Sequence, residues 1–135
     1  MTGIVLDSSI VGCWCFPDES SPVAAAAFDE LGRAGAIVPS LWWFEVRNVL
    51  VVNERRGRID PPGSAAFLAD LDMLPISFDR QSDSATVLAL ARERRLTVYD
   101  AAYLELALRH EAPLATLDRR LAAAADAAGV ALVGA

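Results

Sequence analysis

The 135-residue sequence predicts an α/β fold, in which helices cover both faces of a parallel β-sheet. Short apolar runs alternate along the chain with longer stretches that have the apolar spacing of helices. Residues typical of helix starts and ends separate these segments. The composition is 54% hydrophobic, which is enough for one core, so we expect a single domain over residues 1–135.

The first half of the chain predicts two strands and three helices. Ser21 and Asp60 each precede a proline, a pair typical of a helix start, and Ser40 is expected to cap the helix between them. Gly35 and Gly57 follow the last helical positions of two helices and end them. The expected elements are strands at residues 3–6 and 36–38 and helices at residues 22–34, 41–56 and 61–73.

The second half predicts the same alternation. Ser82 or Asp83 is expected to open one helix, Asp100 the next and Asp118 the last. Residues 97–98 are expected to be extended. The remaining elements are strands at residues 75–77, 114–116 and 130–133 and helices at residues 83–95, 100–110 and 119–128.

Charge and cysteine content narrow the functional classes. The net charge is −6 and all twelve basic residues are arginines, which argues against a broadly basic nucleic-acid-binding surface. Cys13 and Cys15 are too close for an ordinary disulfide and too few for a zinc site, so we expect reduced thiols. No apolar run approaches the roughly 20 residues that span a bilayer, and no signal peptide is recognised. We therefore expect a cytoplasmic protein that does not contact membranes.

Four carboxylates lie within or beside apolar segments: Asp7, Glu45, Asp100 and Asp118. An ionised carboxylate beside buried apolar surface is costly unless a cation or a donor compensates it, and a divalent cation is one partner that all four can share. Ligand sites in parallel sheets lie outside the carboxyl ends of the strands. Asp7 and Asp118 follow predicted strands and Asp100 opens a helix between them, so we expect these three at one sheet edge.

Each acid taken alone has a simpler interpretation. Each of the three aspartates can be explained as a helix N-cap with no other role. Glu45 can be a surface residue paired with Arg47 or Arg56. On the helix at residues 41–56, however, Glu45 and Asn48 form a polar pair on an otherwise apolar stripe, which favours a functional role.

The acids and their neighbours, taken in order, resemble PIN-domain proteins, specifically VapC-type toxin ribonucleases of toxin–antitoxin pairs. The matching segments are residues 5–9, 39–50, 96–107 and 114–118, with the sequences VLDSS, PSLWWFEVRNVL, LTVYDAAYLELA and LATLD. The resemblance covers essentially the whole chain. It implies a three-layer α/β/α fold with a central parallel sheet of four to five strands.

The resemblance implies a Mg²⁺- or Mn²⁺-dependent endoribonuclease. The acids of the family carry over to Asp7, Glu45, Asp100 and Asp118, and the small hydroxyl of its last motif to Thr116. Asp7 and Asp100 are expected as direct metal ligands, while Glu45 and Asp118 act through water or on a second ion. The departures, Ser8 after the first acid and Trp43 before Phe44, bear on substrate fit.

The resemblance also implies partners. These are an RNA substrate, a second copy of the chain in a homodimer, and a small antitoxin whose tail wraps the active-site groove. Arginines at the rim of an acidic site are needed to contact RNA. Arg47, Arg92 and Arg119 are the candidates.

Two other functions fit parts of the sequence. A degenerate PIN domain or a receiver-like module would bind partners without catalysis, although the complete acidic set argues against it. A phosphohydrolase with Asp7 as nucleophile would be expected to carry a second aspartate two residues later, where this chain has Ser9.

Overall fold

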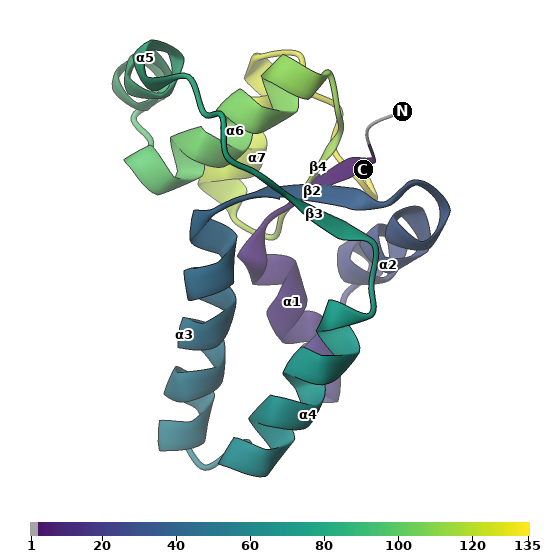
Figure 1. The fold of residues 1–135 in the computed structure, drawn as a ribbon. Helices are drawn as coiled ribbons and strands as arrows, with labels where there is room; N and C mark the ends of the chain where they lie inside the picture. The colour runs from purple at the N-terminus through teal and green to yellow at the C-terminus, as the bar shows by residue number, and fades with distance from the viewer. Residues whose placement is uncertain (1–2) are drawn as a thin grey trace.

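The computed structural model describes residues 3–135 and contains a four-stranded parallel sheet (Figure 1). The strands are β1 (Ile4–Leu6), β2 (Ala36–Pro39), β3 (Ile76–Asp79) and β4 (Leu114–Ala115), in the order β3-β2-β1-β4. The first strand in the sequence therefore lies inside the sheet, between β2 and β4. The predicted parallel sheet is confirmed.

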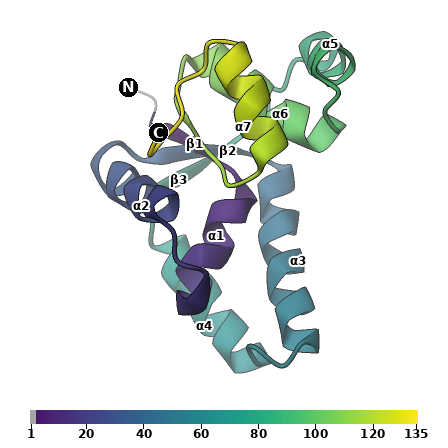
Figure 2. The ribbon, with the colours of Figure 1, turned by 180° about the vertical axis from the view of Figure 1, so that it is seen from behind.

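Within residues 3–135, seven α-helices and a short 3-10 helix surround the sheet. They are α1 (Ser8–Cys15), the 3-10 helix η1 (Pro17–Glu19), α2 (Pro22–Ala34), α3 (Leu41–Arg55), α4 (Pro61–Asp72), α5 (Ser84–Arg94), α6 (Val98–His110) and α7 (Arg119–Ala127). Both ribbon views place α6 and α7 on one side of the sheet and α1, α3 and α4 on the other (Figures 1 and 2). The predicted three-layer α/β/α arrangement is confirmed.

Side-chain caps confirm several predicted helix starts, among them those of α2, α4 and α5. Ser21 accepts a hydrogen bond from the backbone N–H of Ala24 at 3.0 Å, and Asp60 accepts one from Gly63 at 2.8 Å. Asp83, rather than Ser82, caps α5 by accepting from Thr86. These caps satisfy backbone donors that the first helical turn leaves free.

Three local predictions were wrong. Ser40 has helical backbone angles and makes no capping bond, so α3 begins without a side-chain cap. Thr97 caps α6 by accepting from the N–H of Asp100 at 3.1 Å, so the helix begins at Val98 and Asp100 lies in its first turn. Residues 130–133 form only an isolated bridge between Leu132 and Leu114 instead of a fifth strand.

The middle of α6 is buried all round. Every residue from 101 to 107 is buried, including Tyr103 and Glu105. This helix packs against β1, β2 and β4 and against α5 and α7, so it has no solvent-facing stripe in its centre. Burial of a polar side chain costs free energy unless it has a hydrogen-bond partner, so Tyr103 and Glu105 need such partners.

Arg109 links the end of α6 to β3. Its guanidinium donates to both oxygens of Asp79, at 3.0 and 2.6 Å, and to both oxygens of Glu105, at 2.7 and 3.2 Å. The Glu105 side chain is 2% exposed. Arg109 thus compensates two acids at once and holds the pKa of Asp79 below its usual value.

We expect the Asp79–Arg109 pair to make stability depend on pH in the acid range. Because the pKa of Asp79 is lowered on folding, its contribution is present above the unfolded value of 3.8 and is lost as the pH falls through the folded value. Asp79→Asn should therefore lower the free energy of unfolding in urea at pH 7, and the difference from wild type should shrink towards pH 3. Asp70→Asn, at an exposed position on α4, is the control. A difference that does not change with pH would contradict the assignment.

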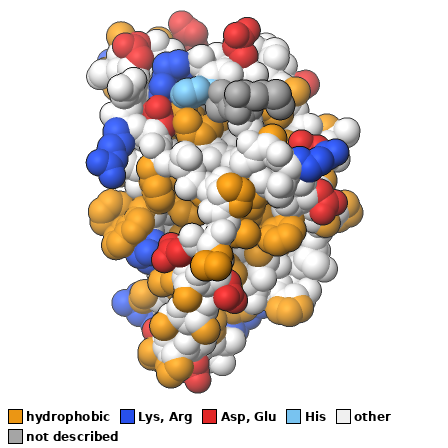
Figure 3. All heavy atoms as spheres, turned by 45° about the vertical axis from the view of Figure 1, so that its right-hand side comes forward, with side chains coloured by type: hydrophobic (Ala, Val, Ile, Leu, Met, Phe, Trp, Pro, Cys, Tyr) orange, Lys and Arg blue, Asp and Glu red, His pale blue; other side chains and the backbone are white. Residues whose placement is uncertain are grey.

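No helix within residues 3–135 is long and apolar enough to cross a membrane. On the face drawn in Figure 3, acidic and basic side chains are interspersed with hydrophobic ones and form no broad basic surface. This agrees with the net charge of −6. Any nucleic-acid binding on this face cannot rest on an extended cationic patch.

Candidate functional site

Asp7 lies at the carboxyl end of β1 and is buried, with 5% of the residue exposed. Its Oδ2 atom accepts hydrogen bonds from the hydroxyls of Ser9, at 2.8 Å, and Thr116, at 2.6 Å. The side chain occupies the N-cap position of α1 but makes no capping bond. The capping interpretation of Asp7 was therefore wrong, and its carboxylate is held by two hydroxyl groups instead.

Thr116 connects Asp7 to Asp118 across two neighbouring strands. β4 ends at Ala115, next to the end of β1, and the N–H of Asp7 donates to the carbonyl of Ala115 at 3.0 Å. The Thr116 hydroxyl also accepts from the N–H of Asp118 at 3.0 Å. Asp118 itself caps α7 by accepting from Leu121 at 3.0 Å. The adjacent carboxyl ends of two parallel strands thus bring together three of the predicted site residues.

Glu45 comes from α3 and is half-buried. Its Oε1 atom accepts a hydrogen bond from the Tyr103 hydroxyl at 2.5 Å, across 58 positions in sequence. Asn48 is exposed, so the predicted polar pair with Glu45 does not form a buried stripe. Tyr103 is a site residue that the sequence analysis missed, although it lies one helical turn after Asp100 on the same helix.

Burial and mutual repulsion act on three of the acids. Burial raises the pKa of Asp7, and the nearby charge of Asp118 raises it further. Burial also raises the pKa of Glu45, to which the charges of Asp7 and Asp100 add. The pKa of Asp100 is raised by burial and then by the charges of Asp118 and Asp7. The four carboxylates are therefore near enough for their charges to act on one another.

No basic side chain in the described part of the chain forms an ion pair with any of the four acids. Arg120 acts only at longer range, where its charge lowers the pKa of Asp100. Within residues 3–135, no three Asp, Glu, His or Cys side chains lie close enough to form a ready-made metal-binding group. The charges of the acids act on one another, and no ion pair among the described residues neutralises them.

The three predicted RNA-contacting arginines lie on different helices. Arg47 on α3 donates to the carbonyl of Trp43 at 3.1 Å and stacks over its ring at 3.7 Å, so it does not pair with Glu45. Arg92 on α5 and Arg119 on α7 are exposed and make no ion pair among the residues described. Arg120, which the sequence analysis did not select, lowers the pKa of Asp100 through its charge.

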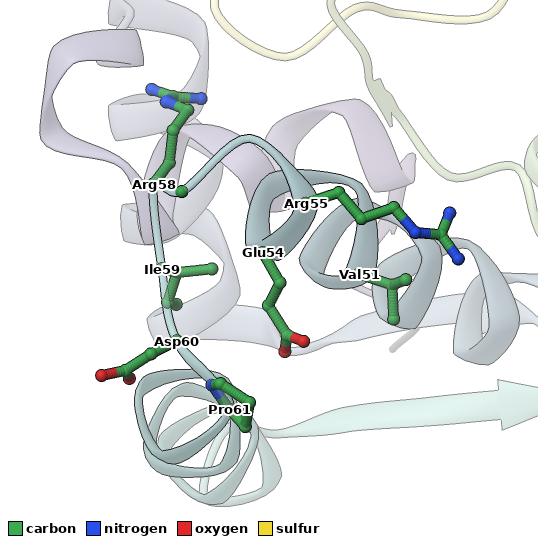
Figure 4. Close-up of a pocket in the computed structure, with 8 residues that line it drawn as sticks. Val51, Glu54, Arg55, Arg58, Ile59, Asp60 and Pro61 are labelled. Carbon is green, nitrogen blue, oxygen red and sulfur yellow. The ribbon is translucent and has the colours of Figure 1, made fainter.

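A hollow of about 820 Å³ lies away from the acids at the connection between α3 and α4. Figure 4 shows the charged groups of Arg55, Arg58 and Asp60 pointing away from its centre. Arg58 is already paired with Asp18 and Glu19. The Glu54 carboxylate points into the hollow and accepts a hydrogen bond from the Ser64 hydroxyl at 2.6 Å.

The chain belongs to the PIN domain family, which matches residues 4–127. It is 31% identical over 122 residues to Ribonuclease VapC3 of Pyrobaculum aerophilum, covering 88% of this chain and 92% of that protein. These matches confirm the predicted resemblance to VapC-type members of the family. In the crystal structure of PAE2754 from Pyrobaculum aerophilum, a protein 24% identical, the same fold superimposes with a TM-score of 0.72 over 91% of this chain and 84% of that one.

Proposed function

We propose that this protein is a divalent-metal-dependent endoribonuclease and the toxin of a toxin–antitoxin pair. The observation that carries the proposal is the set of mutually repelling acids that includes Asp7 and Asp118 at the carboxyl ends of β1 and β4. No ion pair within residues 3–135 involves these acids, and the chain is related over its length to Ribonuclease VapC3. Asp7 is buried and the other three acids are half-buried, and without basic partners such a set is unfavourable for stability alone. A bound cation would offset the repulsion between the acids and so explain why they lie together.

The donor set fits Mg²⁺ or Mn²⁺. All four groups are carboxylates, which hard divalent cations prefer, and Mg²⁺ usually keeps several waters and binds few protein oxygens directly. That preference agrees with the arrangement of the acids within residues 3–135. Their charges act on one another, but no three of them are close enough to surround an ion. Asp7 and Asp100 would bind the ion directly, and Glu45 and Asp118 would act through water or on a second ion.

A bound divalent ion supplies the polarisation of a phosphate oxygen and a lowered pKa for a water molecule. The chain's own groups do the positioning. The hydroxyls of Ser9 and Thr116 hold Asp7 in one orientation. The Tyr103 hydroxyl donates to one oxygen of Glu45, which would orient this carboxylate to accept a proton from the attacking water.

The proposal extends to the partners. RNA would approach over the acids, with Arg92 and Arg119 contacting phosphates at the rim. Arg47, which is stacked on Trp43, would act mainly by fixing that ring. We further propose a cytoplasmic homodimer of this single domain that is inhibited by a small antitoxin protein.

The direct test is cleavage of an end-labelled RNA by the purified protein. We expect cleavage with Mn²⁺ or Mg²⁺ and none with excess EDTA. Calorimetric titration with Mn²⁺ separates the proposal from the alternative of a binding module without catalysis. Absence of both cleavage and Mn²⁺ binding would favour that alternative.

We expect Mn²⁺ to stabilise the metal-free protein. Because the ion offsets repulsion within the acidic set, a concentration about 100 times Kd should add about 2.7 kcal/mol and raise Tm by several degrees. Asp100→Asn should raise the Tm of the metal-free protein slightly, since it removes one of the repelling charges, and should abolish most of the Mn²⁺ effect. Asp126→Asn, at an exposed position on α7, should respond to Mn²⁺ like wild type. An equal Mn²⁺ effect on all three proteins would contradict the assignment of the site.

A further inference from the structure

A second hollow, of about 720 Å³, opens where β2 and β3 end. Its walls include Trp43, Phe44, Phe78 and Arg80, and its rim carries the hydroxyls of Ser40 and Ser82. Pro39 and Asp79 are paired in the sheet, so the start of α3 and the segment after β3 leave the same edge of the sheet side by side. The hollow is of a size that holds a small ligand.

The aromatic walls are exposed, yet their rings are fixed by neighbours. Phe44 is 69% exposed, Trp43 44% and Phe78 40%. Trp43 contacts Phe44 edge-on, with ring centroids 5.0 Å apart, and the guanidinium of Arg47 lies over its ring at 3.7 Å. Phe78 packs edge-on against the buried ring of Trp42 at 5.7 Å. Exposed apolar side chains gathered in one place mark an interaction site, and fixed rings lose little freedom when a flat ligand stacks on them.

The charged groups of the hollow favour an anion. Arg80 is exposed and forms no ion pair with any residue from 3 to 135. The carboxylate of Asp79, also in the lining, is neutralised by two hydrogen bonds from Arg109. An arginine beside aromatic faces is the combination that binds single-stranded nucleic acid, with bases stacked on the rings and phosphate on the guanidinium.

The hollow lies at the same edge of the sheet as the acids of the candidate site. Phe44 directly precedes Glu45 on α3, and the strand order β3-β2-β1-β4 places the hollow beside the acids that follow β1 and β4. Neighbouring strands are about 4.8 Å apart, so β3 and β1 are separated by roughly 10 Å. A strand of RNA with a phosphate over Asp7 can therefore extend along the sheet edge to the hollow.

We propose that this hollow binds one unpaired base of the RNA substrate, stacked on Phe44 beside the edge-on ring of Trp43, with Arg80 on an adjacent phosphate. The inference rests on the proposed ribonuclease activity and adds a base-binding subsite to it. A base paired within a duplex is stacked in the helix and cannot enter the hollow. The subsite thus restricts cleavage to positions next to an unpaired nucleotide. Because the protein has a net charge of −6, base stacking in the subsite contributes RNA affinity that a broadly basic surface would otherwise provide.

The test compares Phe44→Ala and Arg80→Gln with wild type on a single-stranded RNA oligonucleotide and on copies that carry one abasic position near the cut. Stacking of one base contributes about 1–3 kcal/mol. We therefore expect Phe44→Ala to raise KM about 10-fold with kcat little changed. Wild type should lose a similar factor on one of the abasic substrates, whereas Phe44→Ala should not discriminate between the substrates. Met73→Ala, which removes an 85% exposed side chain outside the lining, is the control.

Binding without turnover gives an independent readout. Trp43 is the exposed tryptophan in the hollow and Trp42 is buried, so metal-free oligonucleotide should quench tryptophan fluorescence in wild type and much less in Trp43→Phe. If wild type does not cleave RNA, the proposed activity fails while quenching still tests the hollow. Cleavage and quenching unchanged in Phe44→Ala and Arg80→Gln would overturn the subsite. Conversion of a dimer to a monomer by Phe44→Ala, with unchanged cleavage per subunit, would also overturn it and assign the surface to self-association.

Discussion

Asp100→Asn is expected to reduce metal-dependent RNA cleavage by about 10³-fold while the fold is retained. The substitution keeps the size of the side chain and the hydrogen bond from the N–H of Asp100 to Thr97, which uses backbone atoms of residue 100. It removes one of the charges that offset a divalent cation. The measurement is the single-turnover rate of cleavage at saturating Mn²⁺, together with circular dichroism of the purified variant.

Two comparisons make that result specific. Asp126→Asn carries the same chemical change on an exposed part of α7 and should cleave RNA like wild type. Tyr103→Phe removes the donor to Glu45 but no carboxylate, so it should have a smaller effect on the rate than Asp100→Asn. Equal rates for wild type and Asp100→Asn would exclude the proposed role of the acidic set.

Short-range features of the fold could be predicted because their causes are local. Ser21 and Asp60 cap helices through backbone groups three residues away, and Gly35 ends α2 with a positive φ of 78° that glycine adopts without strain. The start of α6 was misplaced because Thr97 and Asp100 are both good N-caps within one turn. Which of the two residues becomes the N-cap depends on where the backbone changes from extended to helical. The types of the residues do not determine that position.

The candidate site was predictable to the extent that topology determines it. Asp7, Thr116 and Asp118 follow strands, and parallel strands place their carboxyl ends together, so these residues could be assigned to one edge from the order of elements. The contact of Tyr103 with Glu45 joins two helices and depends on how α6 packs against α3, which no local pattern encodes. The same holds for Arg109, whose acidic partner Asp79 lies 30 positions away.

Among the substitutions considered, Arg109→Met is expected to lower the free energy of unfolding most. Arg109→Met keeps the aliphatic stem but removes the cation, which leaves Glu105 buried without its hydrogen-bond donor and Asp79 without its ion pair. Breaking a buried ion pair by removing one partner costs about 3–5 kcal/mol. The Arg109 side chain is 28% exposed, so water can partly replace it, and the lower end, about 3 kcal/mol, is expected. A domain of this size is stable by only about 5–15 kcal/mol, and the loss should be plain in urea unfolding at pH 7.

A second substitution identifies the cause of that loss. If the destabilisation comes from a buried uncompensated charge, Glu105→Gln added to Arg109→Met should restore part of the stability, because a neutral amide is less costly to bury than a carboxylate. Glu105→Gln alone should be destabilising, since it weakens the bonds with Arg109. Strictly additive effects of the two substitutions would show that packing of the arginine stem, rather than charge, connects α6 to β3. The acids of the candidate site differ from Glu105 in this respect, because the described part of the chain supplies no arginine that pairs with them.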